Sequence, residues 1–124
     1  MSNTVIAVPS EMPGGLEALR TAHFGQAASF TLVEIVDGVI GTTRVIANPP
    51  HQHGGCMSTV NLLASSGATA VAAVGMGGGP LNGFQQMGIP VYFEETGHTV
   101  AEAIAAVLDG RAKQFTSEHA CKGH

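Results

Sequence analysis

Short apolar segments, separated by glycine, proline and polar residues, alternate along the chain in lengths that suit strands and helices. Runs rich in β-branched and other apolar residues predict five strands, at residues 4 to 8, 28 to 36, 39 to 47, 70 to 74 and 89 to 93. Asp37-Gly38 lies between the second and third runs. Because these residue types tolerate positive φ, the pair predicts a tight hairpin turn.

Apolar residues that recur at helical spacing predict three helices. Glycines mark their ends, while a proline and a capping box mark two of their beginnings. The expected helices are one from about Gly55 to Ser66, one from Pro80 to just before Gly88, and one that begins at the Thr99 and Glu102 capping box and ends at Gly110.

The order of these elements is β-β-β-α-β-α-β-α, which predicts an α/β fold with a mixed five-stranded sheet. Right-handed crossovers make the strands on either side of a helix parallel, so strand two alone should be antiparallel to the others. The ends of strands one, three, four and five then share one edge with the start of strand two. Open α/β sheets bind ligands at such an edge. On it fall His23, residues 51 to 56, residues 75 to 80 and His98.

Composition narrows the partners that this fold could have. The 124 residues suit one domain, at residues 1 to 110, followed by a polar tail at residues 111 to 124 that we expect to be a flexible arm. A formal net charge of −4 argues against nucleic acid as a partner. The chain has no apolar stretch long enough to cross a bilayer and no signal-peptide pattern, so we expect a cytoplasmic protein with no membrane partner. A structural disulfide is not expected in that compartment. The oligomeric state stays open.

Two histidines and a cysteine lie within six residues in the segment His51-Gln52-His53-Gly54-Gly55-Cys56. The segment follows two prolines and contains two glycines, so it can fold around a metal. Cys56 lies where the first turn of a helix would favour its thiolate, which is the form that ligates metals. Imidazole and thiolate suit Zn, Cu(I) and iron–sulfur species. The alternative is a surface loop with incidental histidines, because the spacing is not that of a zinc finger.

The expected edge also carries a glycine-rich turn. Gly75, Gly77, Gly78 and Gly79 precede a helix, whose first N–H groups and dipole could bind an anion such as a sulfide-bridged cluster. The dinucleotide pattern is absent because Pro80 stands where it needs a glycine, and the P-loop pattern is absent because no Lys-Ser/Thr pair follows. The alternative is a turn that only lets a helix and a strand pack closely.

Three further residues are candidate ligands by type. His23 is a weak candidate alone, and its place on the same edge strengthens it. Cys121 and His124 belong to the polar tail, which could close over a site as an arm. The alternative for the tail is an unstructured terminus whose histidines are incidental.

Patterns of catalytic residues are missing. The few acidic residues show no pairing for acid–base work or two-metal hydrolysis, and the first strand carries no carboxylate. The chain also lacks a nucleophile elbow and a metalloprotease motif. We therefore expect that the protein is not an enzyme.

Several segments together carry a resemblance that covers nearly the whole chain. In their order and spacing they resemble the dinitrogenase iron–molybdenum cofactor biosynthesis family, which includes accessory carriers of nitrogenase cofactor assembly and a carrier-like domain of the cofactor-building radical enzyme. The segments are Ile6-Ala7-Val8-Pro9-Ser10, Gly14-Gly15-Leu16-Glu17, His23-Phe24-Gly25, Asn48-Pro49-Pro50 with His51 to Cys56, Gly75 to Leu81, and the tail with Cys121 and His124.

The resemblance implies a ribonuclease-H-like sheet without nuclease carboxylates, and a carrier of an iron–sulfur or molybdenum-containing cluster. It implies partners that donate and accept the cluster during cofactor assembly. His23 matches the His-Phe-Gly of the family, and His51, His53 and Cys56 match the His-rich loop of one subgroup. Other members lack the cysteine, and a neighbouring branch binds a molybdenum–copper sulfide cluster without an obvious Cys ligand, so the cluster type stays open.

Three hypotheses follow. The first is a non-catalytic carrier or scaffold for a metal–sulfur cluster. The second is a mononuclear Zn or Cu sensor or buffer, in which Cys121 and His124 complete a tetrahedral site. The third is a small ribonuclease-H-like enzyme, which the missing carboxylates disfavour.

Overall fold

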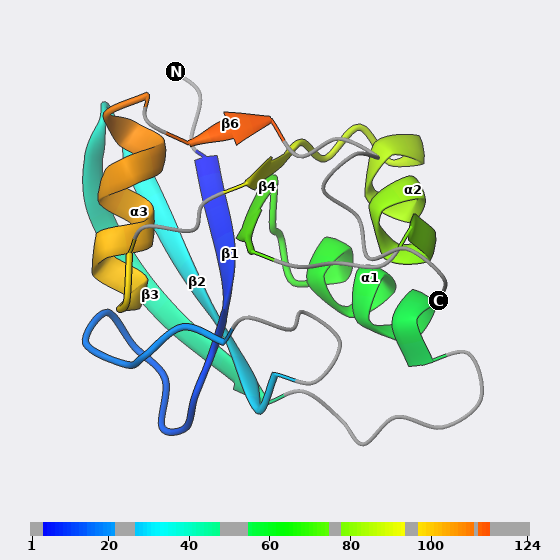
Figure 1. Cartoon of the computed structure of the whole chain (residues 1–124), viewed down its shortest axis with the longest axis horizontal. Coiled ribbons are helices and arrows are strands. Elements are labelled where there is room, and N and C mark those ends of the chain that lie inside the picture. Colours follow the sequence, from blue (N-terminus) through cyan, green and yellow to red (C-terminus); the bar gives the residue numbers. More distant parts are fainter. Residues whose placement is uncertain are drawn as a thin grey trace.

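In the part of the chain that the structure describes, six strands form one mixed sheet with the order β3-β2-β1-β4-β5-β6 (Figure 1). The structure is a computed structural model that describes residues 4–21, 27–47, 55–74, 78–93, 97–110 and 112–114. The strands are β1 (Thr4–Ser10), β2 (Ser29–Val36), β3 (Val39–Ala47), β4 (Ala70–Ala73), β5 (Val91–Phe93) and β6 (Lys113–Gln114).

The strand directions confirm the predicted topology. β1 pairs in parallel with β4, and β4 with β5, whereas β2 is antiparallel to both β1 and β3. β1, β3, β4 and β5 therefore run in one direction. The hairpin between β2 and β3 turns at Asp37 and Gly38, whose φ angles are 54° and 80°. Two consecutive positive φ angles give the turn a twist that matches the flanking strands.

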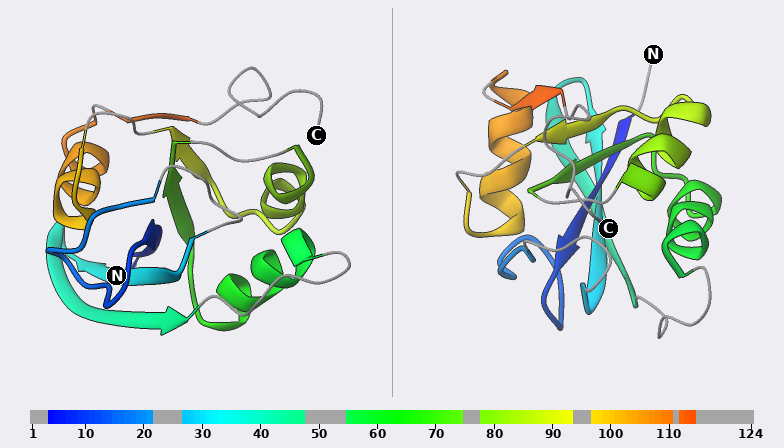
Figure 2. Two further views of the ribbon diagram at one scale, coloured as in Figure 1. Left: turned by 60° about the horizontal axis from the view of Figure 1, so that its bottom comes forward. Right: turned by 45° about the vertical axis from the view of Figure 1, so that its right-hand side comes forward.

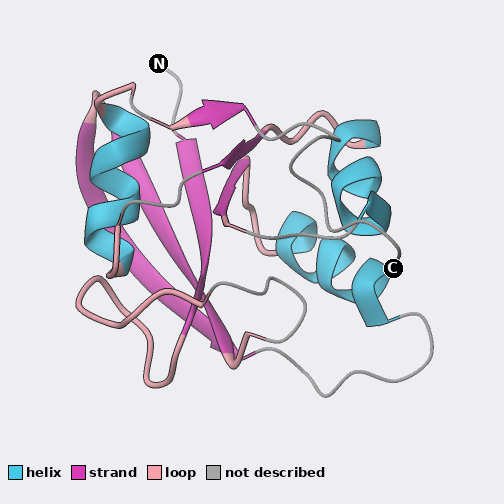
Figure 3. Ribbon diagram, viewed as in Figure 1, coloured by secondary structure: helices cyan, strands magenta, loops and turns pink. Residues whose placement is uncertain are grey.

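Helices cover both faces of the sheet, so the fold has three layers (Figures 2 and 3). α1 (Gly55–Ser65) and α2 (Gly78–Gln86) lie side by side on one face, and α3 (Val100–Leu108) lies on the other. The sequence predicts these three helices, and the difference is that α2 begins at Gly78, two residues before the expected start at Pro80. Among the described residues, no helix combines the length and the apolar character that crossing a membrane requires.

Each face of the sheet has its own apolar core. On the first face, Val60 and Leu63 of α1 pack with Leu81 and Phe84 of α2 against the strands. On the second face, α3 packs against side chains of β1, β2 and β4; that cluster contains Ile6, Val8, Val33, Ile35, Ala70, Ala72, Val100, Ala103 and Ile104. The alternation of side chains along β1 and β2 supplies both cores, because successive residues of a strand point to opposite faces.

Two details at the strand ends differ from the prediction. β1 continues through Pro9 to Ser10 instead of stopping at the proline. The carbonyl of Pro9 accepts the Thr21 N–H, on the side away from β2, so the missing N–H of the proline costs no bond to β2. The sheet also gains β6, which pairs antiparallel with β5. It consists of two polar residues in the segment 111–124, too short to leave a hydrophobic pattern.

The predicted capping box of α3 is present. Thr99 Oγ1 accepts the Glu102 N–H at 3.2 Å, while Glu102 Oε1 accepts the N–H groups of His98 at 2.6 Å and Thr99 at 3.4 Å. These backbone donors lower the pKa of the Glu102 carboxyl from its ordinary value of 4.5. The ionised carboxylate therefore stabilises the start of α3.

The effect of this cap should depend on pH. Because the folded pKa of Glu102 is lowered, its contribution is fully present above pH 4.5 and is lost as pH falls through the folded value. Thermal melts of the wild type and Glu102→Gln, taken from neutral pH to about pH 3, should show a difference in Tm that closes at the acid end. A difference that persists unchanged at the acid end would contradict this assignment.

Candidate functional site

One edge of the sheet collects the strand ends that precede the candidate ligand segments. β1 ends there at Ser10, β3 at Ala47, β4 at Ala73 and β5 at Phe93, and β2 begins there at Ser29. We call this the carboxyl edge. The chain leaves it toward residues 51 to 54 and 75 to 77, and returns to it after residues 22 to 26. The described strand ends thus have the arrangement that the sequence predicts.

The structure describes three of the ten candidate site residues, and only through the backbone. Cys56 is the second residue of α1, and Gly78 and Gly79 are the first two residues of α2. The other seven lie outside the described residues; they are His23, His51, His53, Gly75, Gly77, Cys121 and His124. Among the described residues, His, Cys, Asp and Glu side chains form no group of three or more that could hold a metal ion.

The helix beginnings at this edge differ in charge. The first turns of α1 and α2 contain no acidic residue. The first turn of α3 contains Glu102, whose carboxylate accepts the backbone N–H groups of His98 and Thr99. A helix N-terminus presents free N–H groups and a partial positive charge of roughly half an electron. The two helices on one face therefore begin without a carboxylate of their own, and the helix on the other face supplies its own anion.

Three buried hydroxyls join β1 and β2 at the carboxyl edge. Ser10, Ser29 and Thr31 are each 0% exposed. Ser10 Oγ lies 2.8 Å from Ser29 Oγ and 2.9 Å from Thr31 Oγ1, and Thr31 Oγ1 accepts the Gly15 N–H at 3.0 Å. This hydroxyl cluster fixes the loop after β1 to the start of β2. The sequence analysis did not identify it, because Ser10 and Ser29 meet only through the strand register; its one local signal is polar residues at the ends of apolar strands.

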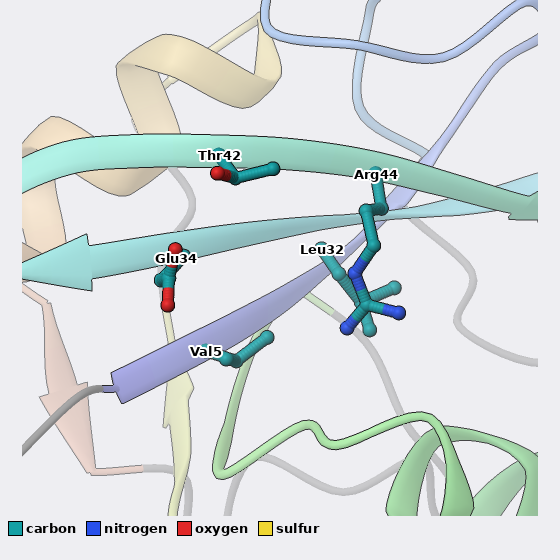
Figure 4. A pocket seen from close by; sticks show the side chains of 5 residues that line it. All are labelled: Val5, Leu32, Glu34, Thr42 and Arg44. Carbon is teal, nitrogen blue, oxygen red and sulfur yellow. The ribbon is translucent and has the colours of Figure 1, made fainter.

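A hollow of about 180 Å³ lies away from the carboxyl edge (Figure 4). Its lining comes from the first three strands and consists of Val5, Leu32, Glu34, Thr42 and Arg44. Arg44 also donates from Nη2 to the carbonyl of Ser66 at 2.7 Å, just beyond the end of α1. A cation is favourable at the carboxyl end of a helix, and the last turn of α1 has no basic residue of its own. Arg44 therefore links β3 to the end of α1, the helix that carries Cys56 near its other end.

Removing the central hydroxyl should destabilise the fold. In Ser10→Ala, Ser29 Oγ still lies 3.1 Å from the Ser10 carbonyl and can donate to it, but the Thr31 hydroxyl loses its partner at Ser10 Oγ. A buried donor without a partner costs about 1–3 kcal/mol. Urea denaturation should show this loss relative to Ser65→Ala, where the removed hydroxyl is exposed at the end of α1. Equal stability of the two variants would show that the hydroxyl cluster contributes nothing.

Comparison with known proteins agrees with this architecture. An uncharacterized protein of Methanocaldococcus jannaschii is 32% identical over 95 residues, which cover 75% of this chain and 80% of the relative. The apo form of the orange protein from Desulfovibrio gigas matches with a TM-score of 0.78 and 29% identity, over 91% of this chain and 93% of that one. A candidate NifB protein from Thermotoga matches with a TM-score of 0.73 and 29% identity, over 93% and 98%.

The family match covers most of the sequence. The model of the family described as "Dinitrogenase iron-molybdenum cofactor" matches residues 4–110, which include all the strands except β6 and all three helices. The strand order also fits the ribonuclease-H-like arrangement that the resemblance implies. The chain belongs to the dinitrogenase iron–molybdenum cofactor family.

Proposed function

We propose that this protein is a non-catalytic carrier that holds an iron–sulfur or molybdenum-containing cluster, or its precursor, as cargo during cofactor assembly. Membership of the family supports a role in that pathway. The observation that carries the finer proposal is the pair of carboxylate-free helix N-termini on one face, with Cys56 in the first turn of α1. A sulfide-bridged cluster is anionic, so it is attracted to such helix ends.

The proposed ligands combine the described helix beginnings with the segments beside them. His51, His53 and Cys56 are the first choice, and His23 is the fourth ligand. The N–H groups at the start of α2 are proposed as donors to the cluster, from the segment that contains Gly75, Gly77, Gly78 and Gly79. Thiolate and imidazole are ligands that soft metal–sulfur species accept. Cys121 and His124 are candidates for closing the site from the tail.

The role as a carrier is favoured over an enzymatic one. β1 carries no carboxylate, so the central strand offers no ligand for catalytic metal ions. The partners that this role requires are one protein that donates the cluster and one that accepts it. A mononuclear Zn or Cu site is the second candidate, since the same His and Cys donors suit a tetrahedral ion.

The cargo can be tested by metal and acid-labile sulfide analysis, with an ultraviolet-visible spectrum, of protein purified without oxygen. The wild type should contain Fe or Mo together with sulfide. Cys56→Ala and the His51/His53 double alanine variant should lose most of both, because thiolate and imidazole donors are removed. Asn61→Ala, which changes an exposed residue of the same helix, is the matched control and should keep them.

The alternatives give different results. If the wild type contains Zn or Cu without sulfide, and Cys56→Ala loses that metal, the protein binds a mononuclear ion and not a cluster. Equal metal and sulfide contents in Cys56→Ala and Asn61→Ala would remove Cys56 from the site. No metal under any loading condition would contradict the carrier function.

A further inference from the structure

Three large apolar side chains are exposed beside the carboxyl edge. Met12 is 60% exposed, Leu19 59% and Val45 41%. Met12 and Leu19 belong to the loop that follows β1, the blue loop at the lower left of Figure 1, and Val45 lies two residues before the end of β3. The loop rests on this strand, since a Cβ added at Gly14 would lie 2.5 Å from Val45 Cγ1. We call Met12, Leu19 and Val45 the edge patch.

The loop that carries the edge patch is held by backbone hydrogen bonds. The Glu11 N–H donates to the carbonyl of Leu19 at 2.9 Å, and the Thr21 N–H donates to the carbonyl of Pro9 at 2.9 Å. The hydroxyl cluster holds the same loop through the Gly15 N–H. The loop is also bound to α3, whose Val100 N–H donates to the carbonyl of Ala18 at 2.9 Å. Because the loop is already ordered, it loses little conformational entropy when a partner binds it.

The exposed charges on the loop of the edge patch are negative. Glu11 and Glu17 are exposed on the same loop. The one cation of the loop, Arg20, donates from Nε to the carbonyl of Gly97 and is partly buried. Two copies of this chain that met through the edge patch would bring these carboxylates together, which is unfavourable. The charge pattern therefore fits a different protein, with apolar side chains surrounded by Lys and Arg.

We propose that the edge patch is the docking surface for the protein that exchanges the cluster with this carrier, and that this partner presents an apolar centre with a basic rim. The inference rests on the proposed function, because transfer requires the partner to approach the edge where the cargo is held. The patch adjoins that edge: Leu19 is three residues before residues 22 to 26, which contain His23. Apolar side chains that a partner buries and shields from water contribute favourably to the binding energy.

The test is site-specific photo-crosslinking of the full chain in cells of the source organism. The photoreactive residue p-benzoyl-L-phenylalanine replaces Met12, and in the matched control it replaces Met87, which is 46% exposed at the end of α2. Position 12 should give an adduct with another protein, linked within a segment rich in Lys and Arg, and position 87 should not.

Adding Leu19→Ser should cut the adduct roughly tenfold, as the loss of one interface anchor does. Adding Glu17→Lys should also reduce it, whereas Asp109→Lys, the same charge change at the end of α3, should not.

Three results would overturn the docking surface. The first is equal adducts at positions 12 and 87, and the second is an adduct with a second copy of this chain. The third is an adduct that neither Leu19→Ser nor Glu17→Lys reduces. Metal and sulfide analysis separates the two proposals, because Leu19→Ser should keep the wild-type contents. A loaded wild type without the adduct would overturn the docking surface alone. If the wild type contains no metal or sulfide but still forms an adduct that depends on the edge patch, the proposed cargo is contradicted and the docking surface for a basic partner is supported.

Discussion

The parallel pairing of β1 with β4, and of β4 with β5, decides where the loops of this chain lie. Parallel neighbours must be joined by crossovers, so every segment that leaves one of these strands starts at the same edge. The hairpin of β2 and β3 then adds the end of β3 and the start of β2 to that edge. The strand ends on either side of three segments that are far apart in sequence, around His23, His51 to Cys56 and Gly75 to Gly79, therefore lie at the carboxyl edge.

Two kinds of helix beginning distinguish the faces of the sheet. α3 begins with a capping box, in which the Glu102 N–H donates to Thr99 Oγ1 and the Thr99 N–H donates to the Glu102 carboxylate. The N–H groups of Val100 and Ala101 donate to the carbonyls of Ala18 and Leu16. α1 and α2 begin with glycines and have no acidic residue in the first turn. In our proposals, the ends of α1 and α2 attract the anionic cargo, and the loop bound to α3 presents the edge patch to the partner. Cargo and partner would then use different sides of one edge.

Periodicity predicted most of this fold because each element carries its own local signal. Asp37-Gly38 predicted the hairpin, and Thr99 with Glu102 predicted the start of a helix. Gly67 and Gly88 predicted helix ends. The structure contains all of these local features. β6 was missed because two polar residues have no periodicity. The hydroxyl cluster and the contact of Arg44 with Ser66 were missed because they depend on strand register. For the site, the sequence predicted that Cys56 lies near the start of a helix, as it does in α1. Gly78 and Gly79 were expected in the loop before a helix, and they are instead the first two residues of α2. The ligand set itself remains a prediction.

The claim that the cargo binds at the α1 and α2 side of the carboxyl edge is tested most directly by amide NMR of ¹⁵N-labelled protein. Spectra would be compared before and after anaerobic reconstitution with iron and sulfide, and separately with tetrathiomolybdate. Amides in the first turns of α1 (residues 55–58) and α2 (residues 78–81, except Pro80) should shift or broaden, and those in the first turn of α3 (residues 100–103) should not. Changes confined to α3, or none in α1 and α2 with a loaded protein, would contradict the proposed site.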